Sequence, residues 1–189
     1  MHQQKENEGQ RKPWWIDCVS LGVLPCGSFF GLKSIQSEVK TMPLVTFLRH
    51  CQSTFNANGD PTRNCGLTAC GIESAKQIKG EYDVVLCSPL LRARQTLDWS
   101  QIKYGSVHFL ESLREIRDGN PINLYSLESD NQLHESGDQI IARVNAAKST
   151  ILSFSKDGAR VLVISHYTFL YALTGRGFSN GGCVEIVIL

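Results

Sequence analysis

The chain has 189 residues, enough for one domain with a buried core and too few for two ordinary ones. Its 19 basic and 18 acidic residues give a formal charge of +1, so no global field favours nucleic acid or an anionic membrane. The seven cysteines form neither a CxxC pair nor a cluster with histidine, which argues against a disulfide framework or a zinc site. Reduced thiols in the cytoplasm are the simpler interpretation.

The N-terminal segment differs from the rest of the chain. Residues 1–12 are polar and charged, which is typical of disorder. Residues 14–32 are mostly apolar, but Asp17 and Pro25 argue against a membrane span, and no clear signal-peptide cleavage site follows. We expect residues 1–42 to be a disordered or loosely docked extension and residues 43–189 to form one domain.

From residue 43 onward, strand-like apolar runs alternate with helix-length segments. This order predicts an α/β fold in which helices cover both faces of a mostly parallel sheet. The expected strands are residues 44–48, 84–86, 106–110, 161–164 and 184–189. The expected helices run from residue 67 to Gly80, from 91 to 99, and from 136 or 137 to 157.

The first strand-like run, residues 44–48, stops at Arg49 and His50. Arg92 and His166 follow two other apolar runs in a similar way. If the three runs are neighbouring parallel strands, their carboxyl ends gather these four side chains at the edge where open α/β sheets bind ligands. Such a pocket suits a phosphate group.

His50 has the properties of a nucleophile in this setting. The preceding strand fixes its backbone, and a reference pKa of about 6.5 leaves the ring largely neutral near pH 7. Arg49 is expected to bind phosphoryl oxygens through planar, paired hydrogen bonds and to discourage protonation of His50. The alternative is a surface pair of charges at the end of a strand.

Arg92 and His166 each have a structural alternative as well. We expect Ser88 to cap the helix that carries Arg92 in its first turn, where free N–H groups favour an anion. Without context, Arg92 is as well explained by a solvated surface position. A single histidine after a strand is more often structural, so only its joint placement with His50 favours a function for His166.

A carboxylic acid is needed to protonate a leaving group. Glu115 is the best candidate, because it follows soon after a predicted strand. Burial or a bound phosphate is needed to raise its pKa among flanking arginines. Glu111 and Asp118 compete for the role, and spacing alone does not choose among the three.

The segment from Arg49 to Asn56 resembles the Arg-His-Gly signature of the histidine phosphatase superfamily, the phosphoglycerate mutase-like fold. Further similar segments follow in order: Gly66-Leu67-Thr68 with Gly71, Ser88-Pro89 with Arg92-Ala93, Leu113 with Glu115, Glu135-Ser136 with Arg143, and Ser165-His166. The resemblance extends from about residue 43 to the end. It implies a three-layer α/β/α sandwich with a mostly parallel central sheet.

The resemblance also implies a set of roles. His50 attacks the phosphate and becomes a phosphohistidine, and Glu115 protonates the departing oxygen and then activates water. The phosphate-binding residues that it implies are Arg49, Arg92, His166, Asn56 and Ser53. It implies no metal and no cofactor, because fixed cations neutralise the developing charge.

The chain departs from the family pattern at three positions. Cys51 and Tyr167 replace the glycines that usually follow the two histidines, and Asn64 is the nearest candidate for a usual aspartate. We expect the Cys51 side chain to point into the core. Tyr167 is expected to narrow the pocket or to bind substrate.

Together these features predict a metal-independent phosphatase that hydrolyses phosphomonoesters of a small molecule or a phosphoprotein. The segment 110–137 is short, and the open pocket that this predicts favours a phosphatase over a phosphoglycerate mutase-type phosphotransferase. A catalytically weak phospholigand-binding module is the other alternative. The sequence predicts no nucleic-acid partner, and it determines neither the substrate nor the oligomeric state.

Overall fold

The computed structural model describes residues 42–125, 128 and 132–188. The extension expected over residues 1–42 lies outside the described residues, apart from Met42. A five-stranded sheet in the order β3-β2-β4-β1-β5 forms the centre of the described part. Its strands are β1 (Leu44–Arg49), β2 (Lys79–Cys87), β3 (Gln101–Phe109), β4 (Val161–Ser165) and β5 (Cys183–Val187).

The sheet is mostly parallel, as the sequence predicts. β1 pairs in parallel with β4, and β2 pairs in parallel with both β4 and β3. Only β5 runs antiparallel, beside β1 at one edge. The three strands that carry the predicted site are therefore direct neighbours, and their carboxyl ends lie at the same edge of the sheet.

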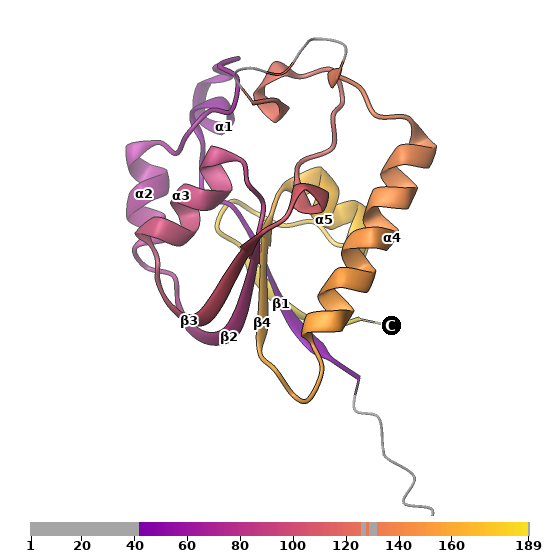
Figure 1. The fold of residues 1–189 in the computed structure, drawn as a ribbon. Helices are drawn as coiled ribbons and strands as arrows, with labels where there is room; N and C mark the ends of the chain where they lie inside the picture. The colour runs from indigo at the N-terminus through magenta and orange to yellow at the C-terminus, as the bar shows by residue number, and fades with distance from the viewer. Residues whose placement is uncertain (1–41, 126–127, 129–131, 189) are drawn as a thin grey trace, which may run out of the picture. The chain divides into compact units, whose positions relative to one another are not determined.

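Helices cover both faces of this sheet. Figure 1 shows α2 and α3 on one side and α4 and α5 on the other. The helices are α1 (Thr54–Asn58), α2 (Ala69–Ala75), α3 (Leu91–Trp99), α4 (Gly137–Phe154) and α5 (Tyr167–Thr174). Two 3₁₀ turns, η1 (Glu111–Leu113) and η2 (Pro121–Asn123), lie between β3 and α4.

The core explains why the sheet is covered on both faces. Successive strand residues point to opposite faces, so an uninterrupted apolar strand presents side chains to both. On one face, Phe47 belongs to a buried cluster with Ile151 of α4 and Phe169 of α5. On the other, Leu48 belongs to a cluster with Leu97 of α3. Each such side chain stabilises the fold by about 1.5–3 kcal/mol through burial.

The helix expected to run to Gly80 ends earlier. Thr68 caps α2 by accepting a 2.9 Å hydrogen bond from the N–H of Gly71, and the helix stops at Ala75. Gly80 lies inside β2, where it pairs with Ile102 of β3. The prediction of Gly80 as a helix stop is wrong because strand pairing begins at Lys79, before the apolar run that is visible in the sequence. Within the described residues, every helix is too short or too polar to span a membrane.

Candidate active site

Backbone pairing brings the two histidines together. Arg49 lies opposite Ser165 in the parallel pair of β1 and β4, and the N–H of His50 donates to the Ser165 carbonyl at 3.0 Å. His50 and His166 therefore directly follow the paired ends of two neighbouring strands, β1 and β4. Their ring centroids are 5.0 Å apart.

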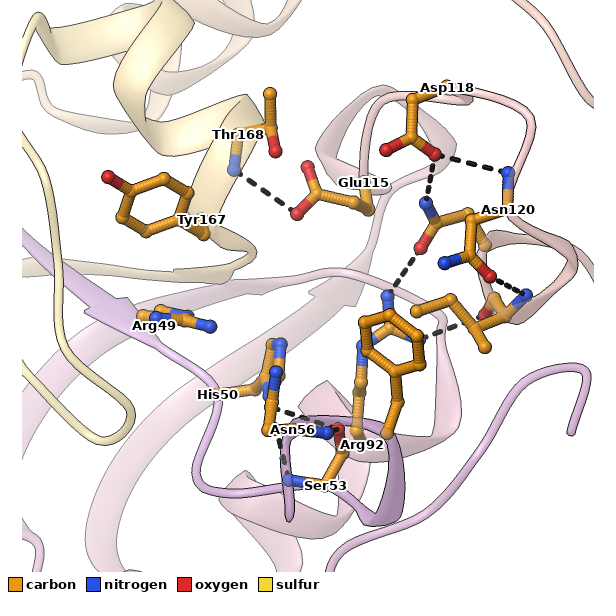
Figure 2. A pocket seen from close by; sticks show the side chains of 13 residues that line it. Arg49, His50, Ser53, Asn56, Arg92, Glu115, Asp118, Asn120, Tyr167 and Thr168 are labelled. Carbon is orange, nitrogen blue, oxygen red and sulfur yellow. Dashed lines mark hydrogen bonds between the residues drawn. The ribbon is translucent and has the colours of Figure 1, made fainter. Parts of the chain in front are cut away.

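A pocket opens at this edge of the sheet (Figure 2). Its volume of about 190 Å³ is below the roughly 300–1,000 Å³ of sites that enclose a whole small molecule, so it suits a phosphoryl group and its nearest atoms. Six of the predicted residues line it: Arg49, His50, Ser53, Asn56, Arg92 and Glu115. The other lining residues are Phe55, Asp118, Asn120, Ile122, Asn123, Tyr167 and Thr168.

His50 is held in one tautomer. Its Nδ1 lies 2.7 Å from the carbonyl oxygen of Cys51, and a carbonyl oxygen only accepts hydrogen bonds. Nδ1 therefore carries the ring proton, and Nε2 keeps its lone pair. Burial lowers the pKa of His50 well below 6.5, and the positive charges of Arg92 and Arg49 lower it further.

Cys51 fits where the family pattern has glycine, because its side chain is directed away from the pocket. The residue is fully buried and packs in a cluster with Leu67 and Ala75. Its N–H donates a 2.9 Å hydrogen bond to the Thr96 hydroxyl on α3. The expectation that the Cys51 side chain points into the core is confirmed.

Arg49 is fixed from two sides but keeps donors for a ligand. One terminal nitrogen donates to the Phe178 carbonyl at 2.9 Å, and the guanidinium lies 5.0 Å from the centre of the Tyr167 ring. The Nε–H is buried and has no hydrogen-bond partner among the described residues. A buried donor without a partner is costly, so a phosphoryl oxygen at this point would satisfy it.

Arg92 is almost fully buried, at 2% exposure, and is oriented by the turn that contains η2. Its terminal nitrogens donate to the Ile122 carbonyl at 3.0 Å and to Asn123 Oδ1 at 2.8 Å. The amide of Asn123 in turn donates to the Ile116 carbonyl at 3.1 Å. Sequence reasoning missed Asn123, because it lies 31 residues from Arg92 in a segment without regular periodicity.

Asn56 is oriented by the groups around its side-chain oxygen. Oδ1 accepts hydrogen bonds from the backbone and hydroxyl of Ser53 and from the side chain of Asn180. The amide nitrogen of Asn56 is thereby left for a ligand. The Ser53 hydroxyl, predicted to bind phosphate, donates here to Asn56 at 2.9 Å and caps α1. Asn180 was not among the predicted residues.

His166 lies behind the pocket and is not part of its lining. The ring is fully buried, with Nε2 2.7 Å from the Ser88 hydroxyl and Nδ1 without a partner among the described residues. Ser88 was expected to cap α3, but that helix has Leu90 as its N-cap, without a side-chain bond. Ser88 instead orients the second histidine.

Glu115 is the buried acid of the pocket. Its carboxylate accepts backbone hydrogen bonds from Ile116 at 2.9 Å and, in the first turn of α5, from Thr168 at 3.1 Å and Phe169 at 2.9 Å. Burial raises the pKa of Glu115, and these donors and the charge of Arg92 oppose the rise without cancelling it. Figure 2 shows Glu115 facing the same cavity as Arg49 and His50.

The two competing acids lie differently. Glu111 is exposed, bonds to Arg114 and Tyr125, and is not part of the lining. Asp118 lines the pocket but is exposed to solvent. In the described part of the chain, no three His, Cys, Asp or Glu side chains lie close enough to hold a metal ion.

Known structures share this fold at low sequence identity. The product of open reading frame Rv3214 from Mycobacterium tuberculosis is 18% identical, with a TM-score of 0.58, and the match covers 78% of this chain and 96% of that one. A proposed α-ribazole-5′-P phosphatase from Escherichia coli is 22% identical, with a TM-score of 0.57, over 76% and 90% of the two chains.

A phosphoserine phosphatase from Entamoeba histolytica, solved with 3-phosphoglyceric acid, is 19% identical, with a TM-score of 0.55, over 77% of this chain and 91% of that one. No curated protein sequence matches the chain at comparable significance. The model of the histidine phosphatase superfamily (branch 1) matches residues 45–180, most of the chain. The chain therefore belongs to the histidine phosphatase superfamily.

Proposed function

We propose that the protein is a metal-independent phosphatase that hydrolyses phosphomonoesters through a phosphohistidine on His50. The Cys51 carbonyl holds the proton of His50 on Nδ1, so an unprotonated Nε2 stands in a buried pocket between two guanidinium groups. An uncharged nitrogen beside fixed cations is what attack on a phosphate dianion requires.

The phosphoryl group binds at the floor of the pocket. Arg49 and Arg92 donate to its oxygens, and their two positive charges offset its two negative charges. The amide nitrogen of Asn56 supplies a neutral donor, with Ser53 orienting it. His166, whose ring centroid lies 5.0 Å from that of His50, is buried beside the pocket, and the lack of a partner for its Nδ1 in the described structure supports a role in holding the phosphoryl group.

The first chemical step transfers the phosphoryl group to the protein. Nε2 of His50 forms a bond to phosphorus while the bond from phosphorus to the ester oxygen breaks. Glu115 delivers its proton to that oxygen, and the raised pKa of this buried carboxyl supports such a role. The products are a free alcohol, an N-phosphohistidine and an ionised Glu115.

The second step returns the protein to its starting state. Glu115, now a carboxylate, takes a proton from a water molecule as the water oxygen attacks phosphorus. The bond from phosphorus to Nε2 breaks, which releases inorganic phosphate and neutral His50. Glu115 is again protonated, so one residue acts as acid and then as base.

The proposal is tested by hydrolysis of 4-nitrophenyl phosphate in the presence of a metal chelator. We expect turnover by the parent and a loss of at least about a thousandfold in His50→Asn. His108→Asn is the matched control, because His108 packs against Phe154 and does not line the pocket. Loss of parent activity on chelation contradicts metal independence.

The same assay separates the two other functions. A mutase-type enzyme would deliver the phosphoryl group to a second alcohol instead of releasing inorganic phosphate. A binding module would retain phosphate or vanadate without turning over any ester.

The cysteines bear on the cellular compartment of the protein. The five cysteines in the described part of the chain are all free, which supports a location in the reducing cytoplasm.

A further inference from the structure

The two arginines of the pocket lie with the reacting groups at its buried floor. Arg49, Arg92, His50 and Glu115 surround the position of the reacting phosphoryl group. Apart from Ser53, Asn56 and Asn123, the rest of the lining consists of Phe55, Asp118, Asn120, Ile122, Tyr167 and Thr168, of which Asp118, Tyr167 and Thr168 are exposed to solvent. This outer set has aromatic, aliphatic and neutral polar side chains and one carboxylate, but no cation.

The two arginines of the floor have no capacity left for a second anion. Both are oriented by carbonyl groups, Arg49 by Phe178 and Arg92 by Ile122, and both face the site of one phosphoryl group. Two guanidinium charges balance one phosphate dianion. A further carboxylate or phosphate on the substrate would therefore need a cation from the outer part of the pocket.

The sequence of the bordering segments supplies no such cation. Within the described residues, the segments 51–62 and 118–125 contain no lysine and no arginine. Arginines adjoin these segments, but each has a partner: Arg114 and Arg117 form ion pairs with Glu128, and Arg63 donates to the Glu128 carbonyl.

Asp118 makes the outer part of the pocket negative. One of its oxygens accepts from the backbone of Asn120 at 3.2 Å and from the side chain of Asn123 at 3.3 Å, which fixes the carboxylate at the rim. Figure 2 shows Asp118 and Tyr167 on opposite sides of the cavity. A leaving group thus passes between an aromatic ring and a carboxylate.

We infer that the substrate is a phosphate monoester whose leaving group carries no second anion and is either neutral or cationic, with an apolar part against Tyr167 and Phe55. This inference rests on the proposed phosphatase function and narrows it. The predicted substrate differs in charge from the ligand of the Entamoeba histolytica phosphoserine phosphatase. That structure holds 3-phosphoglyceric acid, which has a carboxylate in addition to its phosphate. A bisphosphate is likewise disfavoured.

Three matched substrates test the inference. Each is a phenyl phosphate with a para two-carbon chain that ends in an ammonium, a carboxamide or a carboxylate, so the reacting oxygen is nearly unchanged. We expect kcat/KM at low salt to be about two- to fivefold lower for the carboxylate than for the carboxamide, and highest for the ammonium. Added salt should shrink these differences, because the rim charge is exposed.

A pair of charge-neutralising variants locates the effect. Asp118→Asn should bring the carboxylate-to-carboxamide ratio of kcat/KM close to one. Asp138→Asn, on the exposed first turn of α4 and outside the pocket lining, should leave the ratio unchanged. If Asp118→Asn does not fold, the salt dependence of the parent still shows whether the difference between the carboxylate and carboxamide substrates is electrostatic.

The possible outcomes distinguish a failure of the substrate inference from a failure of the proposed phosphatase function. Equal or faster turnover of the carboxylate substrate, with all three esters hydrolysed, overturns the inference and leaves the phosphatase intact. If none of the three esters is hydrolysed and no phosphohistidine forms on the protein, both the phosphatase proposal and the substrate inference are overturned.

Discussion

The His50 imidazole is held by the backbone of Cys51, whose carbonyl oxygen lies 2.7 Å from Nδ1. The contact uses only a main-chain atom of Cys51, while its side chain is buried in a cluster with Leu67 and Ala75. The chain therefore keeps the orientation of the histidine although it lacks the glycine expected at this position. The orientation of His50 therefore does not depend on which side chain stands at position 51.

Cys51 variants test this separation. Cys51→Ala should lower the free energy of unfolding by about 1 kcal/mol through lost packing, and Cys51→Gly by somewhat more because glycine adds backbone entropy to the unfolded state. Turnover by the folded proteins should change by no more than about twofold. Urea unfolding and kcat/KM measure the two quantities, and a hundredfold loss of turnover in folded Cys51→Ala would mean that the thiol takes part in the reaction.

Asn123 should act as a positioning residue for Arg92. Asn123→Ala removes a 2.8 Å hydrogen bond to a buried charged group, so we expect the inhibition constant for orthovanadate to rise about ten- to a hundredfold. Asn145→Ala, at an exposed site on α4, is the control. Weaker folding without weaker vanadate binding would contradict the positioning role.

Tyr167 should hold Arg49 through its ring rather than its hydroxyl. Tyr167→Phe keeps a ring 5.0 Å from the guanidinium and should retain the parent KM, whereas Tyr167→Gly should raise KM for an aryl phosphate about two- to fivefold. A lower KM in Tyr167→Gly would indicate instead that the ring obstructs the pocket.

The pH profile follows from two pKa shifts in opposite directions. Attack needs unprotonated His50, whose pKa is lowered, so kcat/KM should rise with pH through a limb that lies well below pH 6.5. Protonation of the leaving group needs neutral Glu115, whose pKa is raised. The value of kcat/KM should therefore fall again as the pH increases above the pKa of Glu115. The optimum should therefore lie between the lowered pKa of His50 and the raised pKa of Glu115.

Glu115→Gln should remove the alkaline limb. It should also slow hydrolysis of an alkyl phosphate by about a hundred- to ten-thousandfold, while phosphohistidine formation from 4-nitrophenyl phosphate should be less affected, because that leaving group departs without a proton. Glu111→Gln is the matched control outside the pocket lining. The opposite ranking of the two variants would assign the acid to Glu111.

The sequence predicts the strand ends well because their signal is local. An apolar run that ends in Arg49-His50 or Ser165-His166 marks the edge of a buried strand, and a mostly parallel sheet then brings such edges together. Gly80 misleads because glycine is also tolerated inside a strand, where β2 pairs it with Ile102. The short apolar run in β2 likewise hides the polar residues that begin this strand.

The contacts that orient the candidate site are not visible in the sequence. Asn123 lies 31 residues from Arg92, and Asn180 lies 124 residues from Asn56. Such pairs depend on how loops close over the sheet edge, for which residue spacing carries no signal. The resemblance to a family suggests which residues react, but the structure is needed to identify the groups that hold them.

The most direct test of the account is the covalent intermediate on His50. The protein is mixed with ³²P-labelled aryl phosphate, quenched within milliseconds, and digested at alkaline pH, where phosphohistidine survives. We predict label that is lost in acid and that maps to the peptide containing His50, with a larger amount in Glu115→Gln because hydrolysis of the intermediate is slowed. Substrate turnover by the parent without labelled His50, or label on another residue, would contradict the mechanism.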